Sequence, residues 1–201
     1  MSTSQRVRLS PDTRREQLLD LGVRLLSTRS LDELSIEMLA EEAGISRGLL
    51  YHYFGNKQDF HRAVVRRAAD SLIDVTAPVE DGEPLDRLAR SLEAYVDYVV
   101  ENFAGYTSLV RGAASGNEAL QEIYEEARAA LTDRIFETAG EQGLSTFGVT
   151  DTPAVRLMVR GWSAMTEEVV LSWVRDGRGI PKDELLVLLA AALPAVLGPA
   201  G

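Results

Sequence analysis

Short polar start signals divide residues 10–76 into four consecutive helical segments. Ser10 stands directly before Pro11, and serine is a favoured N-cap while proline is preorganised for the first helical position. Ser35 and Ser46 are placed to start a second and a third segment, and Asn56 is placed to cap a fourth. The chain therefore begins as a run of short helices, which strongly limits the folds open to it.

Apolar residues throughout the chain recur at helical spacing, as Leu18, Leu21 and Leu25 do in the first segment. No segment shows the sustained two-residue alternation, rich in β-branched residues, that is typical of strands. We therefore expect an all-α protein with an N-terminal three-helix domain and a C-terminal helical bundle. The helices expected in the bundle cover Pro84–Asn102, Tyr106–Ser115, Glu118–Gly140, Pro153–Arg175 and Pro181–Leu197.

The two short segments on either side of Gly44 form a predicted helix-turn-helix between Ser35 and Phe54. Gly44 is free to take the positive φ that a tight helix end needs. In this motif the second helix enters the DNA major groove by its N-terminal residues. That exposed start reads Ser46-Arg47-Gly48, and the face expected to be buried consists of Ile45, Leu49, Leu50 and Phe54.

Three residues of the second helix are candidates to read base edges. Arg47 can donate a bidentate pair to guanine O6 and N7. Gly48 has no side chain and permits a close backbone approach to DNA, and His52 can contact a base or a phosphate.

Four further residues are candidates to hold phosphate oxygens, which position a protein on DNA without specifying sequence. They are Ser35, Tyr51, Tyr53 and Lys57. Exposure is the better expectation for Tyr51, as for His52. For Tyr53 a core position and a phosphate contact are equally favoured, because it lies near the Leu49 side of the helix.

The run from Gly44 to Phe60 resembles the signature of the TetR family of transcriptional regulators, and the resemblance covers residues 10–60. It implies a three-helix DNA-binding domain, a fourth linking helix, and a larger helical domain for ligand binding and dimerisation. Leu49 departs from the pattern, because many members have threonine there, which puts the sequence preference in doubt. The positions that match DNA contacts of the family are Ser35, Arg47, Gly48, Tyr51, His52, Tyr53 and Lys57.

The stretch Thr76–Pro84 is rich in proline, glycine and acids, and it predicts a boundary. We expect a DNA-binding domain over 1–56, a connecting helix over 57–76, and a ligand-binding and dimerisation domain over 77–201. Residues 1–76 hold 11 basic and 11 acidic side chains, whereas residues 77–201 hold 10 and 20 and carry the whole net charge of −10. Only the first part can approach a polyanion without strong repulsion.

The C-terminal bundle is expected to hold a small-molecule effector between its helices. A role as ordinary core remains the alternative for each candidate. The apolar and aromatic candidates are Tyr95, Tyr98, Phe103, Tyr106, Tyr124, Phe136, Met158, Trp162 and Met165, and the polar candidates are Glu101, Arg111, Arg128 and Glu167.

The last two long helices are expected to form the interface of a homodimer. The final helix is apolar almost all round, with Leu185, Leu186, Leu188 and Leu189, and such a helix must be buried on several sides. In the preceding helix Trp162, Met165, Val169 and Trp173 recur at helical spacing.

These features together favour a repressor that binds a near-palindromic, double-stranded DNA operator as a dimer and is released by a small molecule. The connecting helix is expected to carry the motion. A helical protein-interaction module without DNA-binding activity is the alternative.

Other classes of function find little support in the sequence. Gly44–Gly48 also matches the G-x-S-x-G elbow of hydrolases, but that elbow needs a preceding strand. His52 and His61 lack the spacing of a helical metal pair. No apolar run reaches the ~20 residues that span a bilayer. We therefore expect no catalytic activity, no metal, no cofactor and no membrane partner, and a cytoplasmic location.

Overall fold

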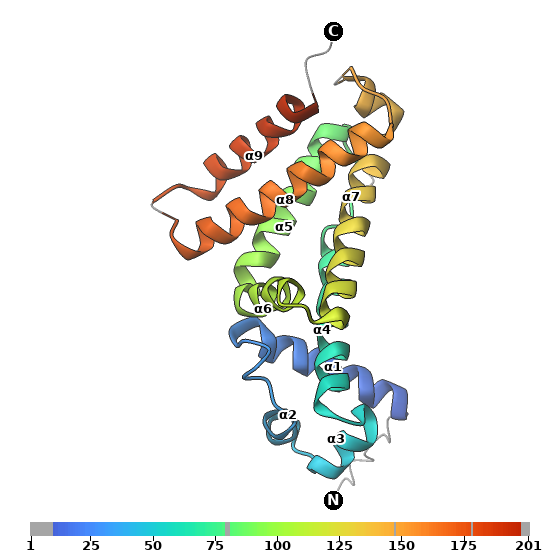
Figure 1. The fold of residues 1–201 in the computed structure, drawn as a ribbon, viewed down its shortest axis with the longest axis vertical. Coiled ribbons are helices and arrows are strands. Elements are labelled where there is room, and N and C mark those ends of the chain that lie inside the picture. Colours follow the sequence, from blue (N-terminus) through green and yellow to red (C-terminus); the bar gives the residue numbers. More distant parts are fainter. Residues whose placement is uncertain (1–9, 79–80, 147, 178, 198–201) are drawn as a thin grey trace, which may run out of the picture.

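The computed structural model describes residues 10–78, 81–146, 148–177 and 179–197, which form α-helices and no strand. The molecule is elongated, with α1–α3 at one end, α8 and α9 at the other, and α4 running from the first group toward the second (Figure 1). The helices are α1 (Pro11–Thr28), α2 (Ile36–Ala43), α3 (Arg47–Phe54), α4 (Lys57–Val75), α5 (Pro84–Glu101), α6 (Phe103–Ala114), α7 (Glu118–Thr146), α8 (Pro153–Arg175) and α9 (Lys182–Leu197).

The four predicted helix starts in the N-terminal part are confirmed. In each case the cap side chain accepts a hydrogen bond from the backbone N–H three residues further on, at 2.9 to 3.3 Å. Gly44 takes φ +63° and ends α2, and its N–H bonds the carbonyl of Glu41. The four capping residues are Ser10, Ser35, Ser46 and Asn56.

The core of α1–α4 is closely packed. Leu34, Leu39, Leu50, Phe60 and Val64 are wholly inaccessible to solvent. A Cβ on Gly22 of α1 would lie 2.7 Å from Val64 of α4, so a glycine is needed where these two helices meet. The same core continues into α6 and α7 through Leu109, Leu120, Ile123 and Ala127.

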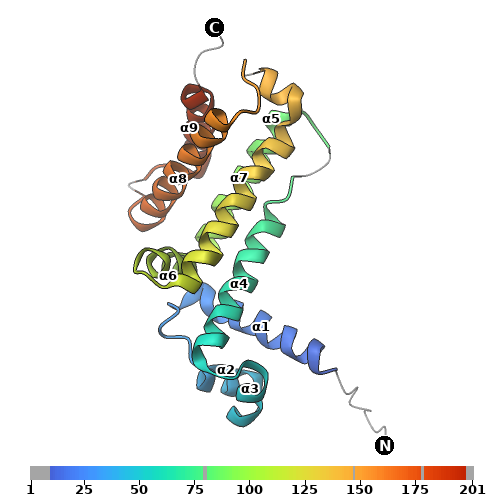
Figure 2. The same cartoon turned by 45° about the vertical axis from the view of Figure 1, so that its right-hand side comes forward.

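The larger part of the molecule is built from α5–α9, and α4 packs beside α7 (Figure 2). Its buried residues form two clusters, one around Val96, Val99 and Val170 and the other around Phe136, Val159 and Trp162. The helical content expected for the bundle is therefore confirmed.

Helices α6 and α7 differ most from the prediction. α6 begins at Phe103 because Asn102 both ends α5 and precedes α6, so the chain turns within one residue. In α7 the predicted end at Gly140 coincides with a break, because this glycine takes the non-helical φ +58° and ψ −175°, and a second helical stretch follows up to Thr146. The predicted α8 limits at Pro153 and Arg175 are confirmed.

The predicted burial of Leu49 is wrong, because 37% of its surface is exposed. α3 has eight residues, and its buried ones, Leu50 and Phe54, lie four apart on one narrow face. Leu49 stands beside that face, toward solvent.

No helix of the described residues is long and apolar enough to cross a membrane. The ends of the predicted domains, residues 1–9 and 198–201, lie outside the described residues.

Candidate DNA-binding surface and ligand cavity

Arg47 is the first residue of α3 and projects into solvent. Its guanidinium Nη1 lies 3.8 Å from Oε1 of Glu37, and the two side chains are 69% and 44% exposed. A contact of this length between exposed groups contributes little, so the guanidinium is free to take another acceptor.

Gly48, the next residue, is exposed and surrounded by open space. A Cβ built on it would meet nothing within 4 Å, unlike one on Gly22 or on Gly105, where Leu26 Cγ would lie at 2.6 Å. A glycine inside a helix costs about 0.5–1 kcal/mol relative to alanine. No contact within the described chain explains this glycine.

The three aromatic residues of α3 differ in exposure. Tyr51 is 44% exposed and His52 is also exposed, whereas Tyr53 is half-buried and packs against the N-terminal core. The rings of His52 and Tyr53 meet edge to face at 5.9 Å. Tyr51 and His52 thus face solvent on α3, and the position of Tyr53 is compatible with both of its predicted roles.

The remaining predicted contacts, Ser35 and Lys57, stand at helix starts. Ser35 is half-buried, and its Oγ accepts the N–H of Met38, which leaves its own hydroxyl proton to donate. Lys57 is exposed at the start of α4. Two of the four predicted phosphate contacts therefore stand at the starts of α2 and α4, and the other two, Tyr51 and Tyr53, lie within α3.

His61 lies nearby on α4 and joins it to the segment before α2. Its Nε2 is 2.6 Å from the carbonyl oxygen of Leu34. Burial lowers the pKa of His61 below its ordinary value, although the bond to Leu34 acts in the opposite sense.

A cavity of about 460 Å³ lies among α5, α7, α8 and α9, within the ~300–1,000 Å³ common for small-molecule sites. Its walls are mainly aliphatic, with Leu92, Leu131 and Leu193 among them. The predicted residues that line it are Tyr95, Tyr106, Trp162, Arg128 and Glu167.

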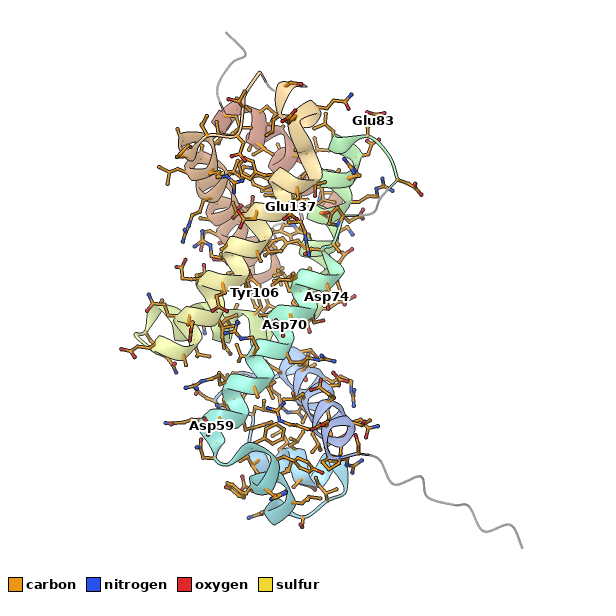
Figure 3. The ribbon with its side chains drawn as sticks, turned by 90° about the vertical axis from the view of Figure 1, so that its right-hand side faces the viewer. Asp59, Asp70, Asp74, Glu83, Tyr106 and Glu137 are labelled. Atoms are coloured by element: carbon orange, nitrogen blue, oxygen red, sulfur yellow. The ribbon has the colours of Figure 1, made fainter. Side chains whose placement is uncertain are left out.

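A second cavity of about 40 Å³ lies where α1, α4, α5, α6 and α7 meet. Tyr98 and Tyr124 line this smaller space, and Tyr106 lines both cavities. Tyr106 stands at mid-height of the molecule (Figure 3), between the helices of the N-terminal core and the larger cavity.

The other candidate liners lie elsewhere. Phe103 packs in the cluster around Val96, and Phe136 lies under the guanidinium of Arg156 at 4.5 Å. The residues on the surface and outside both cavities are Met158, Met165, Glu101 and Arg111.

The carboxylate of Glu167 accepts hydrogen bonds from two tyrosines of the cavity walls. Glu167 accepts the hydroxyl of Tyr106 at 2.8 Å and that of Tyr124 at 2.6 Å. Because Tyr106 donates to Glu167, its oxygen accepts from Tyr95 at 3.0 Å. Burial raises the pKa of Tyr95 and of Tyr106 well above the ordinary value, so both phenols are neutral donors at physiological pH.

Sequence reasoning missed several cavity residues, among them Ser91, Arg134 and Thr166. Isolated hydroxyls in long helices give no periodic signal, so only the packing of α5, α7 and α8 identifies them.

The outer faces of α8 and α9 are apolar. On α8 the exposed residues Leu157, Met158, Gly161 and Met165 follow helical spacing. On α9 Val187 and Leu188 are 67% and 58% exposed.

The prediction that Trp162 lies on the dimer face is wrong, because its side chain is buried inside the protomer. Trp162 is buried, and its Nε1 donates to the carbonyl of Leu189 at 3.0 Å. Leu185 and Leu189 are likewise buried within the protomer. The apolar residues of α8 and α9 therefore lie on two faces, one turned toward the protomer core and one toward solvent, and the sequence pattern did not separate them.

The helix-turn-helix at one end and the cavity-containing helical part at the other define a DNA-binding protein with a separate sensory part. Residues 18–64 match the family described as "Bacterial regulatory proteins, tetR family", and residues 84–195 match "Tetracyclin repressor-like, C-terminal domain". The chain belongs to the TetR family and is a ligand-responsive, DNA-binding transcriptional regulator.

Similar proteins agree with this membership. The transcriptional activator FasR of Mycolicibacterium smegmatis is 25% identical over 88% of this chain and 79% of its own. The regulator BetI of Vibrio atlanticus is 28% identical, and the match spans 48% of this chain and 46% of BetI. The crystal structure of a TetR-family regulator from Streptomyces coelicolor superposes with a TM-score of 0.80 at 35% identity, over 94% of this chain and 82% of that one.

Proposed function

We propose that this chain is a homodimeric repressor that reads a near-palindromic operator with α3 and leaves it when a small molecule fills the larger cavity. The observation that carries the DNA-binding part is Gly48, an exposed helical glycine beside the exposed guanidinium of Arg47, whose ion pair with Glu37 is long. Both features gain a physical reason if the start of α3 lies against DNA. The alternative, an interaction module without DNA binding, is not favoured by the family.

Roles on the DNA follow from exposure. Arg47, Gly48, Tyr51 and His52 form the reading surface of α3, where the Tyr51 hydroxyl can also bond a phosphate, and Ser35, Tyr53 and Lys57 hold phosphates. The division into a DNA-binding domain over 1–56, a connecting helix over 57–76 and a sensory domain over 77–201 belongs to the same proposal.

An Arg47→Ala/Tyr51→Ala double variant tests the reading surface. The probe is a DNA fragment that the wild-type protein selects from a random pool. We expect the double variant to lose at least about tenfold in affinity, because a bidentate arginine contact alone is worth about 1–3 kcal/mol. Arg160→Ala, which removes an exposed arginine of α8, is the control and should bind normally. Wild-type affinity in the double variant would overturn the assignment.

The proposed dimer interface is the apolar outer face of α8 and α9. Gly161 supports this assignment, because it is a second exposed helical glycine on which a Cβ would meet nothing within 4 Å. Beside it stand Leu157, Met158 and Met165, so a partner helix could approach closely over an apolar surface.

Gly161→Leu tests this interface. The protomer has room for the side chain, and we expect the dimer dissociation constant in analytical ultracentrifugation to rise at least about tenfold, because overpacking an interface costs about 1–3 kcal/mol. Arg160→Leu is the control, since that position turns toward Glu125 of α7. Equal dissociation constants for both variants would place the interface elsewhere.

Release of DNA is proposed to pass through α4. Thr76, the cap at its C-terminal end, lines the larger cavity, and Arg134 of the cavity wall bonds the carbonyl of Ile73. Lys57, at the other end of α4, adjoins the reading helix. A ligand that prefers a displaced α4 therefore shifts the dimer away from DNA.

Whether the protein represses or activates transcription needs a separate test, because the similar protein FasR is named an activator. A reporter gene behind the selected DNA fragment should be expressed less when this protein is present. Increased expression would contradict the repressor assignment and leave the DNA-binding surface unaffected.

A further inference from the structure

Four threonines are buried among the described residues, and one of them differs from the rest. Thr76, Thr132 and Thr138 each donate to the backbone carbonyl four residues earlier, at 2.7 to 2.8 Å. Thr166 is 4% exposed, yet its Oγ1 has no hydrogen-bond partner. Leaving a buried hydroxyl unpaired costs about 1–3 kcal/mol.

Ser91, on another helix of the cavity wall, repeats this situation. Its Oγ is buried and has no partner, and Ser91 on α5 lines the same 460 Å³ cavity as Thr166 on α8. By contrast Ser163, another cavity residue, donates to the carbonyl of Val159 at 3.0 Å. Neither hydroxyl is held by the protein, so a rotation about the Cα–Cβ bond can turn each of them toward a molecule within the cavity.

Three of the four charged groups of the cavity wall already have a hydrogen-bond partner. Glu167 accepts two tyrosine hydroxyls, and Arg128 donates to Tyr124 at 3.2 Å and lies over its ring. Arg134 donates to the carbonyl of Ile73.

Asp86, the fourth charged liner, is exposed, so the lining residues sum to zero charge. A charged ligand would enter this largely apolar space at a high desolvation cost and would compete with the contacts that Arg128, Arg134 and Glu167 already make.

We propose that the effector is an uncharged, largely apolar molecule whose carbonyl or ether oxygen accepts hydrogen bonds from Thr166 and Ser91. The inference deepens the proposed ligand-responsive function, because it names the chemical class that the cavity takes. The aliphatic wall supplies most of the affinity, and the two hydroxyls orient the polar end.

The neutral fluorophore Prodan, a naphthalene with a dimethylamino and a propionyl group, tests the class of ligand. Emission of Prodan shifts to the blue when its carbonyl loses a hydrogen bond. The matched anion carries a sulfonate in place of the propionyl group. We expect one Prodan per protomer, bound at least about tenfold more tightly than the sulfonate.

Thr166→Val keeps the shape of the side chain and removes the hydroxyl. It should weaken Prodan binding by about 2- to 10-fold and shift the emission of bound Prodan to the blue. Thr132→Val, a buried threonine of α7 outside the cavity, is the matched control and should change neither quantity. Ser91→Ala should act in the same direction as Thr166→Val.

Tighter binding of the sulfonate, absence of Prodan binding, or equal behaviour of Thr166→Val and Thr132→Val would overturn the inference. The same preparations are titrated with the selected DNA fragment. DNA binding without these Prodan results contradicts only the class of ligand, whereas failure of the wild-type protein to select any fragment from the random pool contradicts the proposed function.

Discussion

The helices around Leu50 and Phe60 and the helices around the larger cavity differ in how completely side chains fill the space between them. In the first group Leu39, Leu50 and Phe60 have no exposed surface. In the second group, a cavity of about 460 Å³ remains among α5, α7, α8 and α9. A close-packed group resists displacement, whereas a cavity leaves helices room to take a second arrangement. We therefore expect the helices around Leu50 and Phe60, the reading end, to be more rigid than the helices around the larger cavity, the sensory end.

The largest expected effect is on the free energy of unfolding, and it is tested by truncating one side chain in each of these two groups of helices. Phe60→Ala should lower the free energy of unfolding by about 3–5 kcal/mol, because a fully buried aromatic ring leaves a new void. Leu131→Ala should cost less than about 2 kcal/mol, because Leu131 already borders both cavities. Urea denaturation of both variants checks the comparison, and equal losses would show that the cavity region is as tightly packed as the reading end.

Gly48→Ala separates folding from DNA binding at the reading end. The added methyl meets nothing in the protomer, so the variant should be more stable by about 0.5–1 kcal/mol. Its DNA affinity should fall at least about tenfold, because the methyl lies where the DNA backbone approaches. Thermal denaturation and DNA titration give the two values. Unchanged affinity would mean that Gly48 does not approach DNA.

Lys57→Ala should have a smaller, electrostatic effect. Removing one phosphate contact reduces the slope of log K against log salt concentration by about 1, similarly for specific and random DNA. Lys182→Ala is the control, because Lys182 pairs with Asp97 and Glu93 far from α3. A slope that stays the same in the Lys57 variant would remove Lys57 from the set of phosphate contacts.

His61 should give the smallest effect, a pH dependence of stability at the reading end. Its pKa in the folded protein is lowered by burial, so the unfolded chain binds more protons below about pH 6.5. The stability due to neutral His61 is complete above that pH and is lost as the pH falls toward the folded pKa. Lys57 and Asp32 act on the same ring in opposite senses.

His61→Gln retains an N–H donor for Leu34 and removes the titration. Its free energy of unfolding should therefore vary less between about pH 7.5 and pH 5.5 than that of the wild type. Identical pH dependence in the two proteins would assign the acid sensitivity to other groups.

Much of the N-terminal fold could be predicted because its signals are local. A serine or asparagine cap, or Gly44 in its left-handed conformation, acts within four residues of its own position. Leu49 was misjudged for the converse reason. Its burial depends on how an eight-residue helix is rotated against α1 and α4, and this is fixed by distant side chains.

The ligand cavity could be predicted only as a general location. Thr132 and Thr166 are the same residue type in long helices, yet one hydroxyl bonds its own helix and the other does not. Trp162 and Met165, three residues apart, face the interior and the surface respectively. Sequence periodicity indicates that a helix has an apolar face, but it does not tell which neighbour covers that face.

Gly48 and Gly161 also bear on how such a protein evolves and is engineered. At each position alanine would raise the stability of the isolated protomer, because alanine favours the helix and nothing in the protomer lies near the added methyl group. If α3 binds DNA and α8 binds the partner subunit as proposed, a screen for heat resistance alone would replace both glycines and enrich well-folded proteins that bind DNA and dimerise weakly. Retention of the two glycines would then indicate selection for binding DNA and a partner subunit. Their loss in a related protein would indicate that it no longer acts as a regulator.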